Sequence, residues 1–149
     1  MNGTHRTNRE RRSCALLLAL LPLACATGSH PARRDTVHQA APGAIGPYSG
    51  AVLAGGFCFV AGKIGERGQG FAHEVETAID AIEAQLAEVG LGLEDAVQAI
   101  VYLTDMGRYA ELNEIYARRF PEPYPARVCI AVAALPGNAL VEIHVTARR

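Results

Sequence analysis

The sequence is poor in the residues from which metal sites and disulfide frameworks are built. It contains only four cysteines and five histidines among 149 residues, and no tryptophan. Cys14 and Cys25 lie near the N-terminus, before the predicted folded domain, which leaves Cys58 and Cys129, both on predicted strands. Two cysteines, with histidines at no ligand spacing, do not make a metal site. Cys58 and Cys129 can form a disulfide only if their strands are neighbours with suitable geometry.

The apolar run Cys14–Ala24 is too short for a membrane-spanning helix, which needs about 20 residues. It follows a segment that contains four arginines. A basic region before a short apolar run is typical of a secretory signal peptide, which we predict over residues 1–26. We therefore expect an exported protein, with residues 27–36 as a linker and residues 37–149 as one folded domain.

The end of the apolar run fits more than one processing outcome. Leu23-Ala24-Cys25 resembles a lipoprotein signal, in which a lipid on Cys25 would tether the domain to a membrane, although Pro22 departs from the usual pattern. Ala24-Cys25-Ala26 also fits ordinary cleavage before Thr27, which would give a free periplasmic domain. A third alternative is an uncleaved cytoplasmic extension or a misassigned start codon.

Acidic residues outnumber basic residues outside the N-terminal leader. Ten of the fourteen basic residues and fourteen of the fifteen acidic residues lie from Thr27 onward, which gives that part a net charge of −4 with neutral histidines. An acidic domain lacks the basic surface that neutralises phosphates in nucleic-acid binding. The glycine-rich segment 65–70 is no phosphate-binding loop, because no Lys-Ser/Thr pair follows it. We predict no nucleic-acid partner.

The hydrophobic pattern predicts an α+β domain with two helices on one face of a mixed sheet. Strands are expected at 37–39, 49–53, 57–64, 96–104, 124–132 and 140–146, and helices at 72–89 and 108–120. Both helices carry an apolar stripe that suits packing on a sheet. Strand 96–104 shows little alternation, which predicts cover on both of its faces. The second sheet face has no further helix to cover it, which favours self-association.

Period-two alternation places Arg127 and Cys129 on one face of their strand. A planar guanidinium at a strand end suits a carboxylate, which it can hold through two parallel hydrogen bonds. The turn 135–138 predicts an antiparallel hairpin with the last strand, so that Arg127 and Glu142 share a sheet face. The pair is either a structural salt bridge or a carboxylate-binding arginine beside a carboxylate that handles water.

Several short motifs occur in an order that resembles the Rid superfamily (RidA, YjgF) of imine and enamine deaminases. They are 44–49, 61–64, 102–106, 112–116, 125–129, and Leu135-Pro136 followed by 141–143. The resemblance spans residue 37 to the C-terminus. It implies a RidA-like, chorismate-mutase-like fold and a homotrimer whose sheets line a central barrel, with ligand clefts between neighbouring subunits.

The resemblance also implies roles for individual residues. Arg127 would hold the carboxylate of the substrate, and Glu142 would position the attacking water. The implied substrate-binding residues are Tyr48, Gly62, Asn113 and Cys129. No metal or organic cofactor is required. The chain departs from the family at Ala61, where serine is common, and at His144, where a second acidic residue often stands.

The implied function is a hydrolase like 2-iminobutanoate/2-iminopropanoate deaminase, which converts a 2-imino acid or its enamine and water into a 2-keto acid and ammonia. A second interpretation is a non-catalytic, small-ligand-binding or holdase-like trimer in the cell envelope. Export favours this interpretation, because reactive enamines arise chiefly inside the cell. A third is ribonuclease activity, which the acidic charge opposes.

Overall fold

The computed structural model describes residues 36–149, and the structural account concerns these residues alone. The elements are β1 (Val37–Gln39), β2 (Ala51–Ala54), β3 (Phe57–Ile64), α1 (Phe71–Ala87), η2 (Leu93–Asp95), β4 (Ala96–Leu103), η3 (Met106–Arg108), α2 (Tyr109–Arg119), β5 (Ala126–Ala131), η4 (Pro136–Asn138) and β6 (Val141–Arg148). The predicted signal peptide, Cys25 and most of the predicted linker lie outside the described residues. Within residues 36–149, no helix combines the length and hydrophobicity needed to cross a bilayer.

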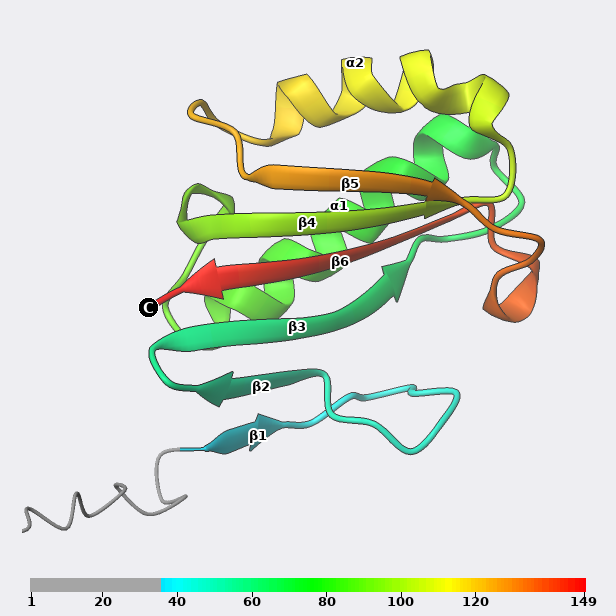
Figure 1. The fold of residues 1–149 in the computed structure, drawn as a ribbon. Helices are drawn as coiled ribbons and strands as arrows, with labels where there is room; N and C mark the ends of the chain where they lie inside the picture. The colour runs from blue at the N-terminus through cyan, green and yellow to red at the C-terminus, as the bar shows by residue number, and fades with distance from the viewer. Residues whose placement is uncertain (1–35) are drawn as a thin grey trace, which may run out of the picture. The chain divides into compact units, whose positions relative to one another are not determined.

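The strands form one six-stranded mixed sheet in the order β1-β2-β3-β6-β4-β5 (Figure 1). Strands β4 and β5 run parallel, and every other neighbouring pair is antiparallel. The tight connection between β2 and β3 is the predicted hairpin. Gly55 and Gly56 occupy its turn at φ 58° and 83°, a region in which a side chain is strained.

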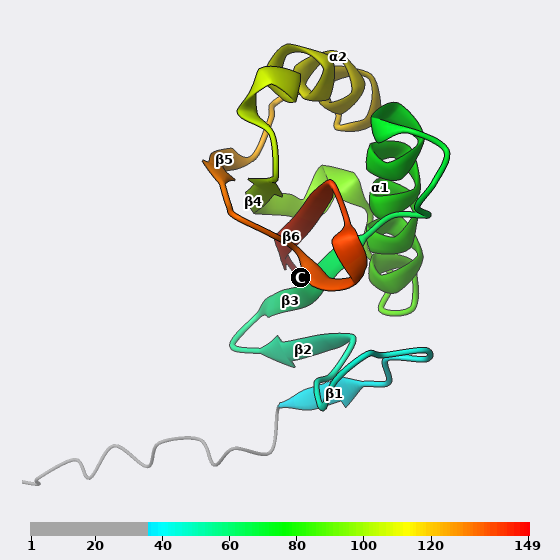
Figure 2. The same cartoon turned by 90° about the vertical axis from the view of Figure 1, so that its right-hand side faces the viewer.

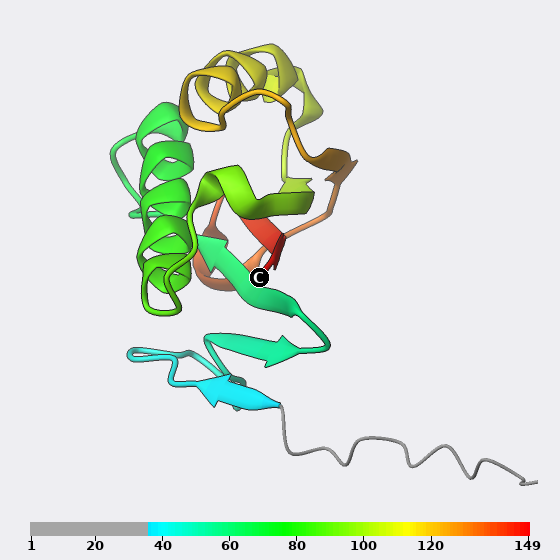
Figure 3. The ribbon, with the colours of Figure 1, turned by 90° about the vertical axis from the view of Figure 1, so that its left-hand side faces the viewer.

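Both helices lie on the same face of the sheet, as the two side views show (Figures 2 and 3). The core forms between them and the sheet, because the apolar stripe of α1 meets the inward-facing residues of the central strands. Its fully buried members include Val75, Ile79, Ile82 and Leu86 of α1 and Val141, Ile143 and Val145 of β6. The predicted α+β class, with two helices on one face of a mixed sheet, is confirmed.

The predicted hairpin between the last two strands is wrong, because β4 lies between β5 and β6. The helix α2 connects β4 to β5, and a helical crossover makes its two strands parallel neighbours. The chain then passes around the end of β4. Val132 N donates to Leu103 O at 2.8 Å on one side, and Thr104 N donates to Leu140 O at 3.1 Å on the other.

The prediction that β4 is covered on both faces is also wrong for the single chain. Its buried residues alternate with more exposed ones, and the buried set faces the helices. The opposite sheet face is open. It presents apolar side chains that are 40 to 48% exposed, namely Phe57, Phe59, Val128 and Ile130. An open apolar face of this kind marks an interaction surface.

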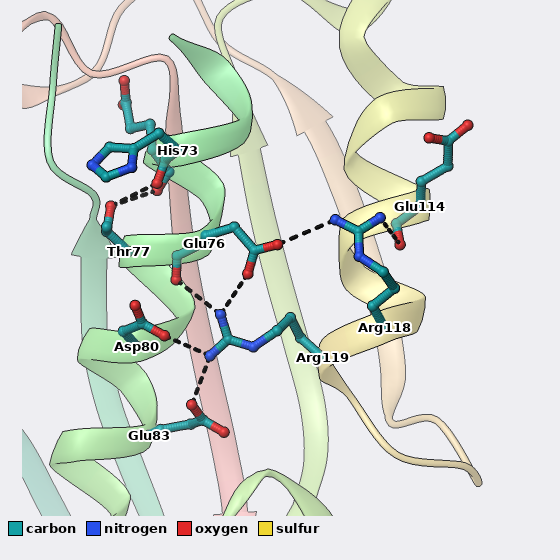
Figure 4. Close-up of polar contacts among 9 residues, drawn as sticks. His73, Glu76, Thr77, Asp80, Glu83, Glu114, Arg118 and Arg119 are labelled. Atoms are coloured by element: carbon teal, nitrogen blue, oxygen red, sulfur yellow. Dashed lines mark hydrogen bonds and ion pairs between the residues drawn. The ribbon is translucent and has the colours of Figure 1, made fainter. Parts of the chain in front are cut away.

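An ion-pair cluster joins the two helices on their outer side (Figure 4). Arg119 of α2 donates to Glu76 at 2.6 Å, to Asp80 at 2.6 Å and to Glu83 at 2.7 Å. These three acids lie on one side of α1, and their carboxylates raise the pKa of Arg119 despite its burial. The neighbouring Arg118 contacts only Glu76 among them, at 3.2 Å.

Replacing Arg119 should therefore destabilise the fold more than replacing Arg118. The Arg119 side chain is 20% exposed and the Arg118 side chain 61%. Arg119→Met leaves three acids repelling one another along α1 and should lower the free energy of unfolding by about 1–2 kcal/mol. Arg118→Met should change it by less than about 0.5 kcal/mol. Urea denaturation at low and high salt measures both, and equal losses would contradict this assignment.

Candidate functional site

Two cavities contain most of the residues implicated by the sequence. The first, called here the Glu142 cavity, has a volume of about 410 Å³. It lies where the loop before β2 meets the ends of β3 and β6. Its lining includes Tyr48, Gly62, Ile64, Pro136 and Glu142. Three predicted site residues therefore meet in one place, although they come from three distant segments of the chain.

The position of Glu142 depends on the missing side chain of Gly62. A Cβ atom built at Gly62 would collide with Glu142 Oε1. The register between β3 and β6 shifts between Val60 and Lys63, so Gly62 lies in an irregular part of the ladder. The carboxylate therefore lies directly against the β3 backbone, and residue 62 must stay small for it to remain there.

The second cavity, called here the Arg127 cavity, has a volume of about 320 Å³. It lies between α2 and the start of the edge strand β5. Its lining includes Asn113, Tyr116, Tyr124, Pro125 and Arg127. Two more predicted site residues, Asn113 and Arg127, are thus in direct contact.

The guanidinium of Arg127 is surrounded by neutral groups. Its Nη2 donates to Asn113 Oδ1 at 2.5 Å and to the Tyr109 hydroxyl at 3.2 Å. Its carbon Cζ lies 4.6 Å from the centre of the Tyr116 ring and 5.6 Å from that of Tyr109. Within residues 36–149, Arg127 forms no ion pair. The cation is thus oriented but not neutralised, which suits it to an anionic ligand.

The aromatic ring of Tyr116 packs against the guanidinium of Arg127. Its ring stacks on Phe120 with centroids 4.0 Å apart and an angle of 10°. Burial raises the pKa of Tyr116 to about 12, against an opposing effect of Arg127, so the phenol stays neutral near pH 7. Its buried hydroxyl has no hydrogen-bond partner among the described residues. The ring, rather than the hydroxyl, is what Tyr116 contributes to the site.

The sequence motifs predict no site role for Tyr109 or Tyr116, although both lie on α2 beside Arg127. Residues 109, 113 and 116 are spaced by four and three, so they share one side of α2. Both tyrosines therefore face the same guanidinium as Asn113. In the sequence, this spacing and the arginine on a later strand are the features that could indicate the two tyrosines as site residues.

Cys129 lies on the helix-facing side of β5, where it pairs with Val101 of β4. It is half-buried and packs against the core, and it lines neither cavity. Burial raises its thiol pKa more than the charge of Arg127 lowers it, so the thiol is not activated. Cys58 and Cys129 are both free, because β6 and β4 separate their strands.

The prediction that Arg127 and Glu142 share a sheet face is wrong. Arg127 pairs with Ala99, which faces the helices, whereas Glu142 pairs with Tyr102, which faces the open side. This follows from the position of β4 between the two strands. A single chain therefore contains two separate groups of predicted site residues, called here half-sites, one with the Glu142 carboxylate and the other with the Arg127 guanidinium.

His144 follows Glu142 on the open face of β6. Its Nδ1 atom is buried and has no hydrogen-bond partner among residues 36–149. Burial lowers the pKa of His144, while the charge of Glu142 opposes this effect. The imidazole is therefore neutral near pH 7 and adds no positive charge beside Glu142.

The chain belongs to the Endoribonuclease L-PSP family, whose model matches residues 38–149. This is the family of the RidA and YjgF proteins. A RutC family protein of Aquifex aeolicus is 43% identical over 122 residues, which cover 76% of this chain and 98% of the relative. The chloroplastic Reactive Intermediate Deaminase A of Arabidopsis thaliana is 36% identical over 113 residues, covering 71% of this chain and 60% of the relative.

Solved structures show the same architecture. The crystal structure of RidA from an Antarctic Psychrobacter species has a TM-score of 0.71 and 36% identity, and covers 78% of this chain and all of that one. The family assignment predicted from the ordered motifs is confirmed. A deaminase role is supported at the level of the family by relatives named reactive intermediate deaminase.

Gly62→Ala should displace the Glu142 carboxylate without unfolding the domain. The added methyl group collides with a side-chain end rather than with the backbone, so the strand can persist while the carboxylate moves. We expect loss of any activity that depends on Glu142 and a change in melting temperature of only a few degrees. Gly46→Ala is the matched control, because its Cβ meets only ordinary contacts with the Tyr48 ring at 3.6 Å. Full activity of Gly62→Ala would contradict the assigned position of Glu142.

Tyr116→Leu should weaken binding of small carboxylates, whereas Tyr116→Phe should not. The leucine removes the ring beneath the guanidinium, which should raise the dissociation constant for 2-ketobutanoate by about three- to tenfold. The phenylalanine keeps the ring and removes only an unpartnered hydroxyl, so affinity and stability should be preserved. Isothermal titration calorimetry separates the two, and equal weakening in both variants would argue against a role for the ring.

Proposed function

We propose that this protein hydrolyses 2-imino acids, and the enamines in equilibrium with them, to 2-keto acids and ammonia. The observation that carries the proposal is the half-buried Arg127, which is oriented by Asn113 and two tyrosines and, among residues 36–149, contacts only neutral groups. Such a cation is suited to the carboxylate of a small acid. Relatives named reactive intermediate deaminase support the same class of chemistry.

The two half-sites would be joined between copies of the chain. The Arg127 cavity lies at β5, the edge strand of the sheet, where a second chain can approach it. The open sheet face presents Phe57, Phe59, Val128 and Ile130, which an assembly would cover. We infer a homotrimer in which the Arg127 cavity of one copy faces the Glu142 cavity of the next.

The reaction follows from the chemistry of these two groups. Arg127 holds the carboxylate and so fixes the neighbouring C=N carbon. Glu142 accepts a hydrogen bond from a water molecule and takes its proton as the oxygen bonds to that carbon. The proton is returned to the imine nitrogen, which gives a carbinolamine. The hydroxyl group of this intermediate then loses its proton, which is passed to the nitrogen as the C=O bond forms and the C–N bond breaks, so that ammonia and a 2-keto acid leave. Every step uses only water and the side chains of the protein.

A mixing experiment tests both the activity and the shared site. Arg127→Ala and Glu142→Gln should each lose about 100-fold or more in turnover of 2-iminopropanoate generated in situ. If the two are unfolded together and refolded as mixed trimers, roughly a quarter of the clefts should contain both intact residues and recover activity. Recovery requires that Arg127 and Glu142 come from different chains.

Two outcomes would contradict the proposal in different ways. Wild-type protein that binds carboxylates but does not accelerate imine hydrolysis would indicate the ligand-binding alternative. Ala61 favours this test, because the serine hydroxyl common in the family is absent there. Active wild-type protein whose mixed variants recover nothing would place both residues in the site of one chain. Glu142→Gln should retain carboxylate affinity, whereas Arg127→Ala should lose it.

A further inference from the structure

The Arg127 cavity is larger than the group that Arg127 is proposed to bind. Its volume is about 320 Å³, whereas a carboxylate takes up roughly the space of two water molecules, about 30 Å³ each. Most of the cavity is therefore left for the rest of a ligand. In a 2-imino acid the carboxylate and the side chain are attached to the same carbon atom. The side chain of a substrate held by Arg127 can thus enter this remaining space.

The walls of the remaining space are apolar. They consist of two tyrosine rings, a proline ring and a methyl group, which come from Tyr116, Tyr124, Pro125 and Ala117. Among residues 36–149, Arg127 is the only charged residue in the lining, and Asn113 already accepts a hydrogen bond from it through Oδ1. A charged substrate side chain would lose its hydration here without gaining an oppositely charged partner, whereas an apolar one would gain from leaving water.

Tyr124 is the aromatic wall that a ligand can still cover. It is 47% exposed, whereas Tyr116 is 4% exposed and already stacks on Phe120. Pro123 and Pro125 flank Tyr124 in the segment before β5, and both restrict the backbone on either side of it. A tyrosine side chain also loses little conformational entropy when a ligand orders it. Covering this ring should therefore contribute to affinity at a small entropic cost.

Ala117 leaves room for a large side chain on the helix side of the cavity. It lies four residues after Asn113, so both residues face the same side of α2. Ala117 is exposed in the single chain although it lines the cavity. A longer side chain at this position would fill part of the cavity without disturbing the core.

We propose that the Arg127 cavity binds the side chain as well as the carboxylate of the substrate, and that it selects 2-imino acids with a large apolar side chain, such as the imine of phenylalanine. Tyr124 is the specificity-determining residue, because its ring packs against that side chain. This inference rests on the proposed function and extends it to substrate class.

The kinetic test compares the imines of phenylalanine and alanine, generated in situ by amino-acid oxidases. The measured quantity is the ratio of kcat/KM for the phenylalanine imine to kcat/KM for the alanine imine. Tyr124→Ala should lower this ratio by about tenfold, because the ring that covers the large side chain is lost. Tyr124→Phe keeps the ring and should keep the ratio.

A second variant tests the size of the cavity rather than the ring. Ala117→Leu should also lower the ratio by about tenfold, because the added side chain occupies the space that the phenyl group needs. Arg118→Met is the matched control. Arg118 is the next residue of α2, its side chain is 61% exposed, and it does not line the cavity, so the ratio should stay unchanged.

Direct binding separates failure of the subsite from failure of the proposed function. The probes are 3-phenylpropanoate and propanoate, which share a carboxylate and differ by the phenyl group. Isothermal titration calorimetry should show that wild-type protein binds 3-phenylpropanoate about tenfold or more tightly than propanoate. Tyr124→Ala should remove most of this difference, and Tyr124→Phe should retain it. These results are expected even if the protein hydrolyses no imine.

Three results would overturn the subsite while leaving the proposed hydrolysis intact. The first is equal affinity of wild-type protein for the two probes. The second is a preference for the phenyl group that persists in both Tyr124→Ala and Ala117→Leu, which would place the side chain in another cavity. The third is a ratio that falls equally in Tyr124→Phe and Tyr124→Ala, which would make the hydroxyl rather than the ring of Tyr124 responsible.

Discussion

Strand β6 pairs with β3 on one side and with β4 on the other, and the arrangement of the candidate site depends on this double pairing. It makes β6 the most buried strand and directs Glu142 to the open face of the sheet. The start of β6 is also fixed from the helix side, because the buried Glu74 of α1 accepts hydrogen bonds from Leu140 N at 2.5 Å and Val141 N at 3.3 Å. The carboxylate that faces the cavity is therefore held on a rigid strand, two residues beyond an anchored end.

The same pairing separates Arg127 from Glu142. Because β6 occupies the centre, β5 can add only at the far edge of β4, and its Arg127 turns toward α2. The helix then supplies every contact of the guanidinium described above. One chain thus has the Arg127 guanidinium and the Glu142 carboxylate on opposite faces of its sheet. Such an arrangement becomes a single site only if a second chain contributes to it, so assembly and activity are expected to depend on each other.

Much of the fold could be predicted from local patterns. Periodicity placed α1 and α2 within two residues of their observed ends, and Gly55-Gly56 indicated the β2–β3 hairpin. The order of strands could not be predicted in this way, since residues 132–140 look like a hairpin turn but carry the chain around β4. Because the predicted strand order is wrong, the prediction that Arg127 and Glu142 share a sheet face is wrong as well. Tyr116 cannot be predicted as a site residue from the sequence, because the apolar stripe of a helix explains a buried aromatic side chain equally well.

The basic side chains of the domain differ in how far their charge is already neutralised, and this difference separates structural roles from binding roles. Arg119 has three carboxylates within 2.7 Å, so its positive charge is already neutralised and would attract an anionic ligand only weakly. Arg127 and Lys63 are also partly buried, yet they donate their hydrogen bonds to neutral amide or phenol oxygens. Retaining an unneutralised, partly buried cation costs stability, which folding alone does not reward. Arg127 is such a cation and lines a cavity, which is why a carboxylate ligand is proposed for it.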